Sequence, residues 1–579
     1  ADLKIIFKKL SPHFATPGCP KVTTEETEKT KKKQKAKKIT YGEYNPLSKN
    51  IRIHDNFIEH ILKGPEAAQT FECGYGNMYT QTQATFIHEW SHYLDDINDF
   101  SDKFQFKRLA GFDRSNHWFY YLSTFGLYKG PWRSKNKLES RSVNPYEFKN
   151  LKENFSVNFE NYVINPSYAC HHPDYAKYFQ ANFGENKIQK AECSFSTQVL
   201  FNSRNPQYDL RFKVDIDPKR VAEIHYFFAD EGDAIMSRWG HAMFRLIVCS
   251  PLRETVGPDC RKDVAHHVIL SYRANIQDIT VNSFKGLMGK YPSRLYLLPL
   301  PEVVTEYTKE ELRNLISLPI KMNEAEKENF IWTTLRNYWS YEGSYKFIVN
   351  NCATEAAHLL DAGLEENNYI KTLSPKKMYK SLIKNKLIDL QLLENKSQAT
   401  AQGFYFASKK TEFEQALKIL DVKVEYWSTI KASERYTAVL EKIKQEPTKK
   451  TSFAAAAFVI ESKLFFNLGK ELEREILKAV QNNKKVEANS ELKAHFDMAR
   501  MNLQRPPQWT LTKQNGNGIP TQNEFDEIYE LILNNQVELD KGVQEILSKW
   551  LETNFRDLMS ELKNSTIYKE YYRKIILEN

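Results

Sequence analysis

The residues from His88 to His92 read His-Glu-x-x-His, a spacing that suits metal-assisted hydrolysis. Apolar residues at helical spacing surround this motif and predict a helix over residues 84–96. On a helix, His88 and His92 lie one turn apart on one face, so both imidazoles can bind one tetrahedral zinc ion. Glu89 then lies beside the open coordination position, where it can accept a proton from water. We therefore expect Zn²⁺ as a cofactor, with Glu89 as a catalytic base.

A third zinc ligand is expected from the helix predicted within residues 146–162. This segment carries Glu153 and Glu160, seven residues apart and so on one helical face. The two helices resemble gluzincin-type metallopeptidases, in particular the anthrax lethal factor-like group, in which E-x-F-A follows H-E-x-x-H. Glu153 begins the matching Glu-Asn-Phe-Ser, so the resemblance implies that Glu153 binds zinc, with Glu160 as the alternative ligand. It also implies that Tyr146, seven residues earlier, donates to the developing oxyanion.

A second group of residues suits thiol chemistry. Cys352 follows a strand-like run and precedes a helix predicted over residues 353–360. The positive end of a helix dipole stabilises a thiolate, so we expect the pKa of this thiol to be lowered. His241, at the start of a strand predicted over 242–248, is expected to be its base. Cys352 and His241 would then form and release an acyl-enzyme.

Two adjacent histidines compete for an orienting role in this thiol site. His267 begins the strand predicted over 267–272, and His266 directly precedes it. Strand alternation sends their side chains to opposite faces. His267 shares a face with Ile269 and Ser271, and we expect it to face the site, with His266 as the alternative.

The order His241, His267, Asn351-Cys352 resembles the circularly permuted papain-like fold of the NlpC and lecithin-retinol acyltransferase superfamily. From about residue 216 to residue 363, the chain resembles the Lnb-type N-terminal periplasmic domain. The segments that carry this resemblance include Ile224-His-Tyr, Arg238-Trp-Gly-His-Ala, Pro258-Asp-Cys, Ser271-Tyr-Arg-Ala, Tyr296-Leu-Leu-Pro-Leu and Asn351-Cys-Ala. The resemblance implies an exported protein with a Cys–His pair that acts on acyl groups, as in lipoprotein N-acylation.

Cysteine usage also favours an oxidising compartment. Of seven cysteines, Cys249 and Cys260 flank a turn-rich stretch and are the most plausible pair. We expect Cys352 to be free and the other four to form two further bridges. The chain begins with Ala1, and we expect a periplasmic or secreted protein whose signal peptide was removed before this residue.

The net charge of +9 does not predict nucleic-acid binding. Residues 1–38 hold eleven lysines against four acidic residues, so this segment carries +7 and the other 541 residues only +2. The most apolar run, Phe453–Ile460, is far shorter than the roughly 20 residues of a membrane span. We therefore expect no transmembrane segment, while peripheral membrane contact stays open.

The helices and strands that the sequence predicts around these residues indicate an α+β multidomain protein. We expect a basic arm (1–40), a zincin-like α+β domain (41–205), a permuted papain-like α+β domain (206–365) and an all-α helical region (366–579). Within the third part, helices are predicted over 310–318 and 324–339 and a strand over 211–216.

Two functions fit this organisation. The first is an exported hydrolase with a zinc centre and a thiol centre, acting on a peptide, peptidoglycan or lipoprotein substrate. The second is a cell-envelope binding or scaffold protein that retains both folds without catalysis.

Overall fold

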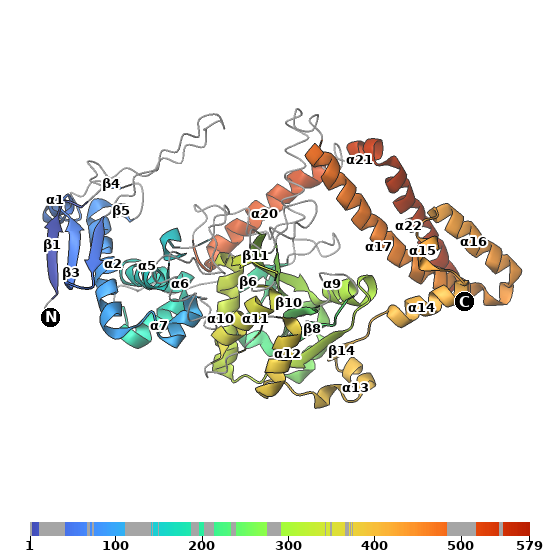
Figure 1. The fold of residues 1–579 in the computed structure, drawn as a ribbon, viewed down its shortest axis with the longest axis horizontal. Coiled ribbons are helices and arrows are strands. Elements are labelled where there is room, and N and C mark those ends of the chain that lie inside the picture. The colour runs from blue at the N-terminus through green and yellow to red at the C-terminus, as the bar shows by residue number, and fades with distance from the viewer. Residues whose placement is uncertain are drawn as a thin grey trace. The chain divides into compact units, whose positions relative to one another are not determined.

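The computed structural model describes residues 3–10, 41–66, 70–71, 75–110, 141, 143–148, 150–186, 196–201, 213–232, 239–274, 291–341, 343–347, 350–364, 370, 372, 374–482, 517–542 and 548–578. The chain divides into two units (Figure 1). Unit 1 comprises residues 1–135, 140–196 and 516–522, and unit 2 comprises residues 136–139, 197–515 and 523–579. The elements confirm the predicted α+β class.

Unit 1 contains a three-stranded sheet in the order β1-β3-β2. β3 (Asn50–His54) pairs in parallel with β1 (Lys4–Lys8) and antiparallel with β2 (Gly42–Asn45). Ile51 and Ile53 alternate inward from β3 and are buried against Phe57 of α1 (Phe57–Lys63) and Met78. Residues 4–8 form strand β1 of this sheet, whereas the sequence predicted a basic arm over residues 1–40. Residues 11–40 lie outside the described residues.

The helices of unit 1 follow a short hairpin, β4 (Thr70–Phe71) and β5 (Gly76–Asn77). The helix predicted around the His-Glu-x-x-His motif is confirmed as α2 (Met78–Asn98), which begins where Asn77 accepts a hydrogen bond from the Thr80 N–H. The other helices are α3 (Phe104–Ala110), α5 (Leu151–Ile164), α6 (Tyr168–His171) and α7 (Pro173–Phe183). Rings from three of them form one aromatic core, with Phe155 of α5 at 5.3 Å from Phe106 and 5.7 Å from Phe179.

A short segment far along the sequence completes unit 1. Gly518 donates its backbone N–H to the Arg141 carbonyl at 2.7 Å, and Ile519 donates its own to the His171 carbonyl at 2.9 Å. The Arg141 guanidinium binds the carbonyls of Asn517 and Gly518 in return. Gly518 has φ +57°, and a Cβ there would collide with the His171 carbonyl, so only glycine fits this position.

Unit 2 is built around a seven-stranded antiparallel sheet in the order β13-β11-β10-β9-β8-β12-β14. Its strands are β8 (Val221–Ala229), β9 (His241–Val248), β10 (Val268–Ala274), β11 (Tyr291–Pro299), β12 (Leu315–Pro319), β13 (Gly343–Tyr345) and β14 (Tyr405–Phe406). A separate pair, β6 (Gln198–Leu200) and β7 (Lys213–Asp215), precedes it.

Different helices cover the two faces of this sheet. One face carries α10 (Glu324–Ser340), α11 (Cys352–Gly363) and α12 (Pro375–Lys384), and we call it the α11 face. Phe244 of β9 points to this face, with its ring 5.1 Å from that of Phe330 in α10. The opposite face carries α9 (Leu300–Val304) and the π-helix η7 (Thr305–Glu310), and we call it the α9 face. Met243 packs there in one cluster with Tyr307.

Of two helices predicted in unit 2, one is wrong and one is confirmed. The helix predicted over residues 310–318 is wrong, because η7 ends at Glu310 and residues 315–319 form β12 between β8 and β14. Leu312, with φ 56°, breaks the helical path. The helix predicted over residues 324–339 is confirmed as α10, whose cap residue Asn323 forms a capping box with Glu326. β14 also extends the sheet past residue 365.

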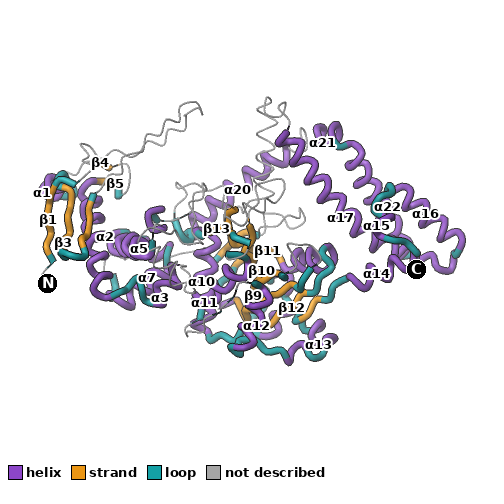
Figure 2. The backbone as a smooth tube through the Cα atoms, viewed as in Figure 1, coloured by secondary structure: helices purple, strands orange, loops and turns teal. Residues whose placement is uncertain are grey.

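The described residues in the remaining part of unit 2 are mostly helical, as Figure 2 shows from α14 onward. Beyond α13 (Lys396–Ala401), its helices are α14 (Lys410–Leu420), α15 (Val424–Trp427), α16 (Ala432–Gln445), α17 (Lys450–Asn482), α20 (Gln522–Gly542), α21 (Ser548–Asn554) and α22 (Arg556–Leu577). Phe453 and Ile460 of α17 are buried in one cluster with Leu420, Val439 and Tyr572.

Among the described residues, one helix is long and apolar enough to cross a membrane by length and composition. It covers Pro447–Ile476, and 39% of its most apolar stretch is buried. The helix continues well beyond both ends of the run Phe453–Ile460, and the expected lack of a transmembrane segment stays a prediction. The central helix of a folded domain passes the same test, and α17 contributes to the cluster described above.

Candidate functional site

The structure brings His88, His92 and Glu153 together between α2 and α5. Glu153 Oε2 lies 3.2 Å from Nε2 of His88 and 3.3 Å from Nε2 of His92. One donor atom from each residue lies within 4.8 Å of the others. The helical i, i+4 spacing places both imidazoles on one face of α2, and the Asn150 cap starts α5 three residues before Glu153. Two imidazole nitrogens and a carboxylate oxygen are a donor set that suits zinc.

The outer nitrogens of both histidines are also bound. Nδ1 of His88 lies 2.9 Å from Oε2 of Glu160, whose other oxygen accepts a 2.6 Å hydrogen bond from Tyr75. Nδ1 of His92 lies 3.0 Å from the Ser156 hydroxyl. Such outer partners fix the orientation of a histidine and leave Nε2 for the metal. Glu153 therefore lies among the donor atoms, whereas Glu160 lies behind His88.

The charges in this cluster complement each other. Burial disfavours the charged form of His88, but its hydrogen bonds to Glu153 and Glu160 outweigh that effect and raise its pKa to about 10. Burial likewise disfavours the Glu153 carboxylate, but hydrogen bonds from His88 and His92 hold its pKa well below the usual range. A divalent cation on these three residues would replace the proton on His88, because ligands bind metals in their deprotonated form.

Glu89 lies on α2 between the two histidines, and it is only 8% exposed. Burial raises the pKa of its carboxyl, although the neighbouring His88 and His92 lower it. Strand β2 passes directly over this side chain, since a Cβ at Gly42 would lie 2.8 Å from the Glu89 Cγ. Glycine at residue 42 thus lets an edge strand approach the carboxylate closely.

Tyr146 lies in a 3₁₀ turn, η1 (Pro145–Phe148), just before α5. Its ring centroid is 6.1 Å from that of His88. The next residue, Glu147, is buried and accepts hydrogen bonds from the side-chain amides of Asn154 and Asn158 on α5, at 3.0 and 2.9 Å. These bonds tie the turn to α5 and hold Tyr146 beside the histidine cluster.

Ser156, Tyr75 and Gly42 were missed by the sequence analysis. Ser156 replaces the alanine of the E-x-F-A motif, and this departure was the available signal, because a hydroxyl can bind the histidine that a methyl group cannot. Tyr75 and Gly42 have no signal of this kind, because their roles depend on contacts between distant segments.

We expect Ser156→Ala to weaken zinc binding by about 10- to 100-fold, because the His92 ring loses the contact that orients it. Competition between the protein and a chelating dye measures this affinity. Ser91→Ala is the matched control, since the Ser91 hydroxyl is also buried on α2 but binds only the His88 backbone carbonyl. Equal affinities of the two variants would contradict the assigned role of Ser156.

The second predicted site centres on Cys352, which is the first residue of α11 and a free cysteine, as expected. Its thiol is buried, with the residue 5% exposed. The Tyr345 hydroxyl accepts a hydrogen bond from the Cys352 N–H at 3.2 Å. Burial raises the pKa of the thiol, even though hydrogen bonds from the Ala242 backbone and from Tyr345 oppose this shift. The expected lowering of this pKa is therefore wrong, because desolvation outweighs the helix terminus.

The structure does not bring His241 to Cys352. In β9, alternation turns the His241 side chain to the α9 face, where its ring lies 6.1 Å from that of Tyr307. Its Nε2 lies 2.9 Å from the Ser271 hydroxyl. Burial and the nearby charges of Arg273 and Arg313 lower the pKa of His241 to about 3. The predicted Cys–His pair is corrected, because its two members lie on opposite faces of the sheet.

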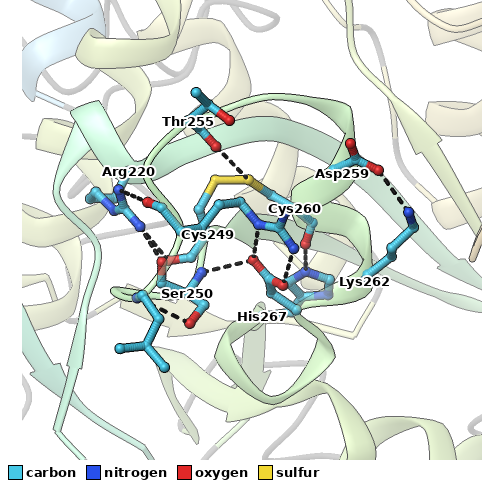
Figure 3. A network of polar contacts seen from close by, with 11 residues as sticks. Arg220, Cys249, Ser250, Thr255, Asp259, Cys260, Lys262 and His267 are labelled. Atoms are coloured by element: carbon cyan, nitrogen blue, oxygen red, sulfur yellow. Dashed lines mark hydrogen bonds and ion pairs between the residues drawn. A yellow bond between two sulfur atoms is a disulfide. The ribbon is translucent and has the colours of Figure 1, made fainter.

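His267 also lies on the α9 face, so it shares a side with Ser271 as predicted but not with Cys352. Its Nε2 lies 2.9 Å from the carbonyl of Cys260 (Figure 3). Its Nδ1 accepts a 2.8 Å hydrogen bond from Arg245. Burial and the charge of Arg245 lower its pKa to about 3. His266 is partly exposed in the turn η6 (Val264–His266). Neither histidine orients a thiol site.

The predicted disulfide between Cys249 and Cys260 is confirmed and is visible in Figure 3. The loop that it closes is also held by Asp263, which accepts hydrogen bonds from the Ser250 N–H and the Arg253 guanidinium. Cys170 is disulfide-bonded as well. Cys19, Cys73 and Cys193 lie outside the described residues, so the remaining pairing stays a prediction.

Two parts of the chain match known families. Residues 208–385 match the Lnb N-terminal periplasmic domain. The resemblance predicted from residues 216–363 is confirmed for this Lnb-type domain, and the match indicates an extracytoplasmic, envelope-associated protein. Residues 123–192, which include Tyr146 and Glu153, match a domain of unknown function (DUF7844). No curated protein and no solved structure matches the chain.

Proposed function

We propose that unit 1 is a zinc-dependent peptidase centre of this envelope-associated protein. The observation that carries the proposal is the convergence of His88, His92 and Glu153 with both outer imidazole nitrogens already bound. Simple acidic or histidine clusters at a surface lack such second partners, whereas histidines that bind metals usually have them.

His88, His92 and Glu153 would hold the zinc ion, which would supply polarisation of the substrate carbonyl and a lowered pKa for a water molecule. Glu89 accepts the proton of that water and delivers it to the leaving amine. Its buried carboxylate and its position between the two ligands suit this role. Tyr146, held beside His88 by the Glu147 contacts, donates a hydrogen bond to the oxyanion.

The substrate in this proposal is an extended chain with an amide bond: a peptide, a peptidoglycan stem or a lipoprotein segment. β2 is an edge strand of the described three-stranded sheet and lies against Glu89 at Gly42. An extended peptide that pairs with such an edge aligns its backbone through main-chain hydrogen bonds. Pairing along β2 would bring the peptide close to the proposed base.

The test uses the purified full chain, metal analysis and a quenched-fluorescence peptide library. We expect about one zinc per chain, and we expect Glu89→Gln to keep the metal while cleavage falls by about 10²- to 10⁴-fold, because the amide cannot accept the proton. Glu59→Gln is the matched control, since Glu59 is an exposed carboxylate of α1 that pairs with Lys63. Cleavage by Glu89→Gln at the rate of the wild type would contradict the proposed base.

For the Lnb-type domain, the buried Cys352 favours the second function, a binding role without thiol catalysis. The thiol has a raised pKa, and its contacts among the described residues include no histidine. We therefore propose that this domain binds an envelope component and that the chemistry belongs to unit 1.

A further inference from the structure

Helix α12 carries a separate feature, a face made only of lysines. Its buried residues are Pro375, Met378 and Leu382. The exposed residues Lys376, Lys377, Lys380 and Lys384 lie within an arc of about 100° on the opposite side, at 3.6 residues per turn. We call these four residues the lysine face.

Among the described residues, acidic side chains balance only part of the charge on the lysine face. α12 contains no acidic residue. In the described part of the chain, Lys376 of this face forms an ion pair with Glu231 at 2.7 Å, and both side chains are more than half exposed, at 57% and 53%. Exposed pairs of this kind are weak. In the helical region after α12, lysines instead alternate with acidic residues and pair with them, as Lys409 does with Glu412 and Lys449 with Glu446.

The helix is also held firmly in place. The Tyr226 hydroxyl of β8 donates to the Pro375 carbonyl at 3.0 Å, and Tyr379 stacks on Phe228 with ring centroids 5.5 Å apart. Ser374 caps the first turn by accepting from the Lys377 N–H. Because the apolar side of α12 is occupied by the sheet, the lysine face is presented outward in a fixed arrangement. Several ammonium groups can therefore meet one anionic surface at once.

We propose that the lysine face docks the Lnb-type domain on a membrane surface that contains anionic phospholipids. The argument is charge complementarity: four fixed cations on one helical face attract a layer of phosphate headgroups. The family match places the domain outside the cytoplasm, where envelope membranes are within reach. The face carries no apolar or aromatic side chain, so contact is with headgroups, not with the hydrocarbon core, and it weakens steeply with salt. The inference does not depend on the proposed peptidase.

The test is co-sedimentation of the full chain with vesicles of phosphatidylcholine and phosphatidylglycerol (70:30) and with vesicles of phosphatidylcholine alone. We expect binding to the anionic vesicles at 50 mM salt and its loss at 500 mM. The variant Lys376→Ala/Lys377→Ala/Lys380→Ala/Lys384→Ala should bind at least tenfold more weakly. Alanine on a solvent-facing helical surface preserves the helix, which circular dichroism confirms.

The matched control is Lys418→Ala/Lys423→Ala/Lys444→Ala/Lys563→Ala, which removes the same charge from exposed positions among acidic residues. We expect less than a twofold change. Equal loss in the two variants would show a general effect of net charge and overturn the proposal. Equal binding to neutral vesicles, or none to either kind, would also overturn it. Binding to soluble polyphosphate that depends on α12, without vesicle binding, would assign the face to a soluble polyanion instead.

Discussion

Glu153→Ala should lower the zinc affinity of the full chain by more than 100-fold. The carboxylate supplies one of three converging donor atoms, whereas loss of an outer partner typically costs about 10- to 100-fold. Glu160→Gln should fall within that smaller range, because the His88 nitrogen that Glu160 contacts is the outer one, Nδ1, and not Nε2. Metal content after dialysis and competition with a chelating dye give both values.

The two glutamates act as controls for each other, since they are carboxylates on one helix that contact the same histidine. Full zinc content in Glu153→Ala together with loss in Glu160→Ala would reverse the ligand assignment. Removal of both carboxylates without loss of zinc would eliminate the site.

Cys352 should react with iodoacetamide at least about 100-fold more slowly in the folded protein than in denaturant at pH 8. The thiol is buried, and its raised pKa reduces the fraction of reactive thiolate. As pH rises through that pKa, the thiolate fraction grows, so the rate in the folded protein should keep increasing above pH 9. A free thiol with a pKa of about 8.5 instead approaches its plateau there. Mass mapping of the peptide that contains Cys352 measures the rate.

His241→Ala should leave this rate unchanged, because the imidazole contacts Ser271 and Tyr307 on the α9 face. A fast-reacting thiol that titrates well below pH 8.5, with a titration that moves upward in His241→Ala, would restore the Cys–His pair and contradict the binding role proposed for the Lnb-type domain.

The convergence of His88, His92 and Glu153 was predictable because its information is local. An i, i+4 pair on a helix has one geometry, and the Glu153 motif lies on a second helix with its own cap. The predicted Cys352–His241 pair was wrong because it depends on packing between distant segments. Alternation along β9 was predictable, but which of His241 and Ala242 turns to α11 depends on how the sheet and helices pack. β12 was missed because strand pairing with β8 overrides the helical pattern of residues 310–318.

The glycine-bearing segment at residues 517–520 sets an order of events during synthesis. Its partners Arg141 and His171 emerge from the ribosome more than 340 residues earlier, as the separations of 377 and 348 residues show. Unit 1 therefore cannot be completed until most of unit 2 has been synthesised. Domains usually fold as contiguous stretches of chain emerge. A fragment ending at residue 196 lacks the segment that binds Arg141 and His171, so we expect the complete unit 1 to require residues from near the C-terminal end of the chain.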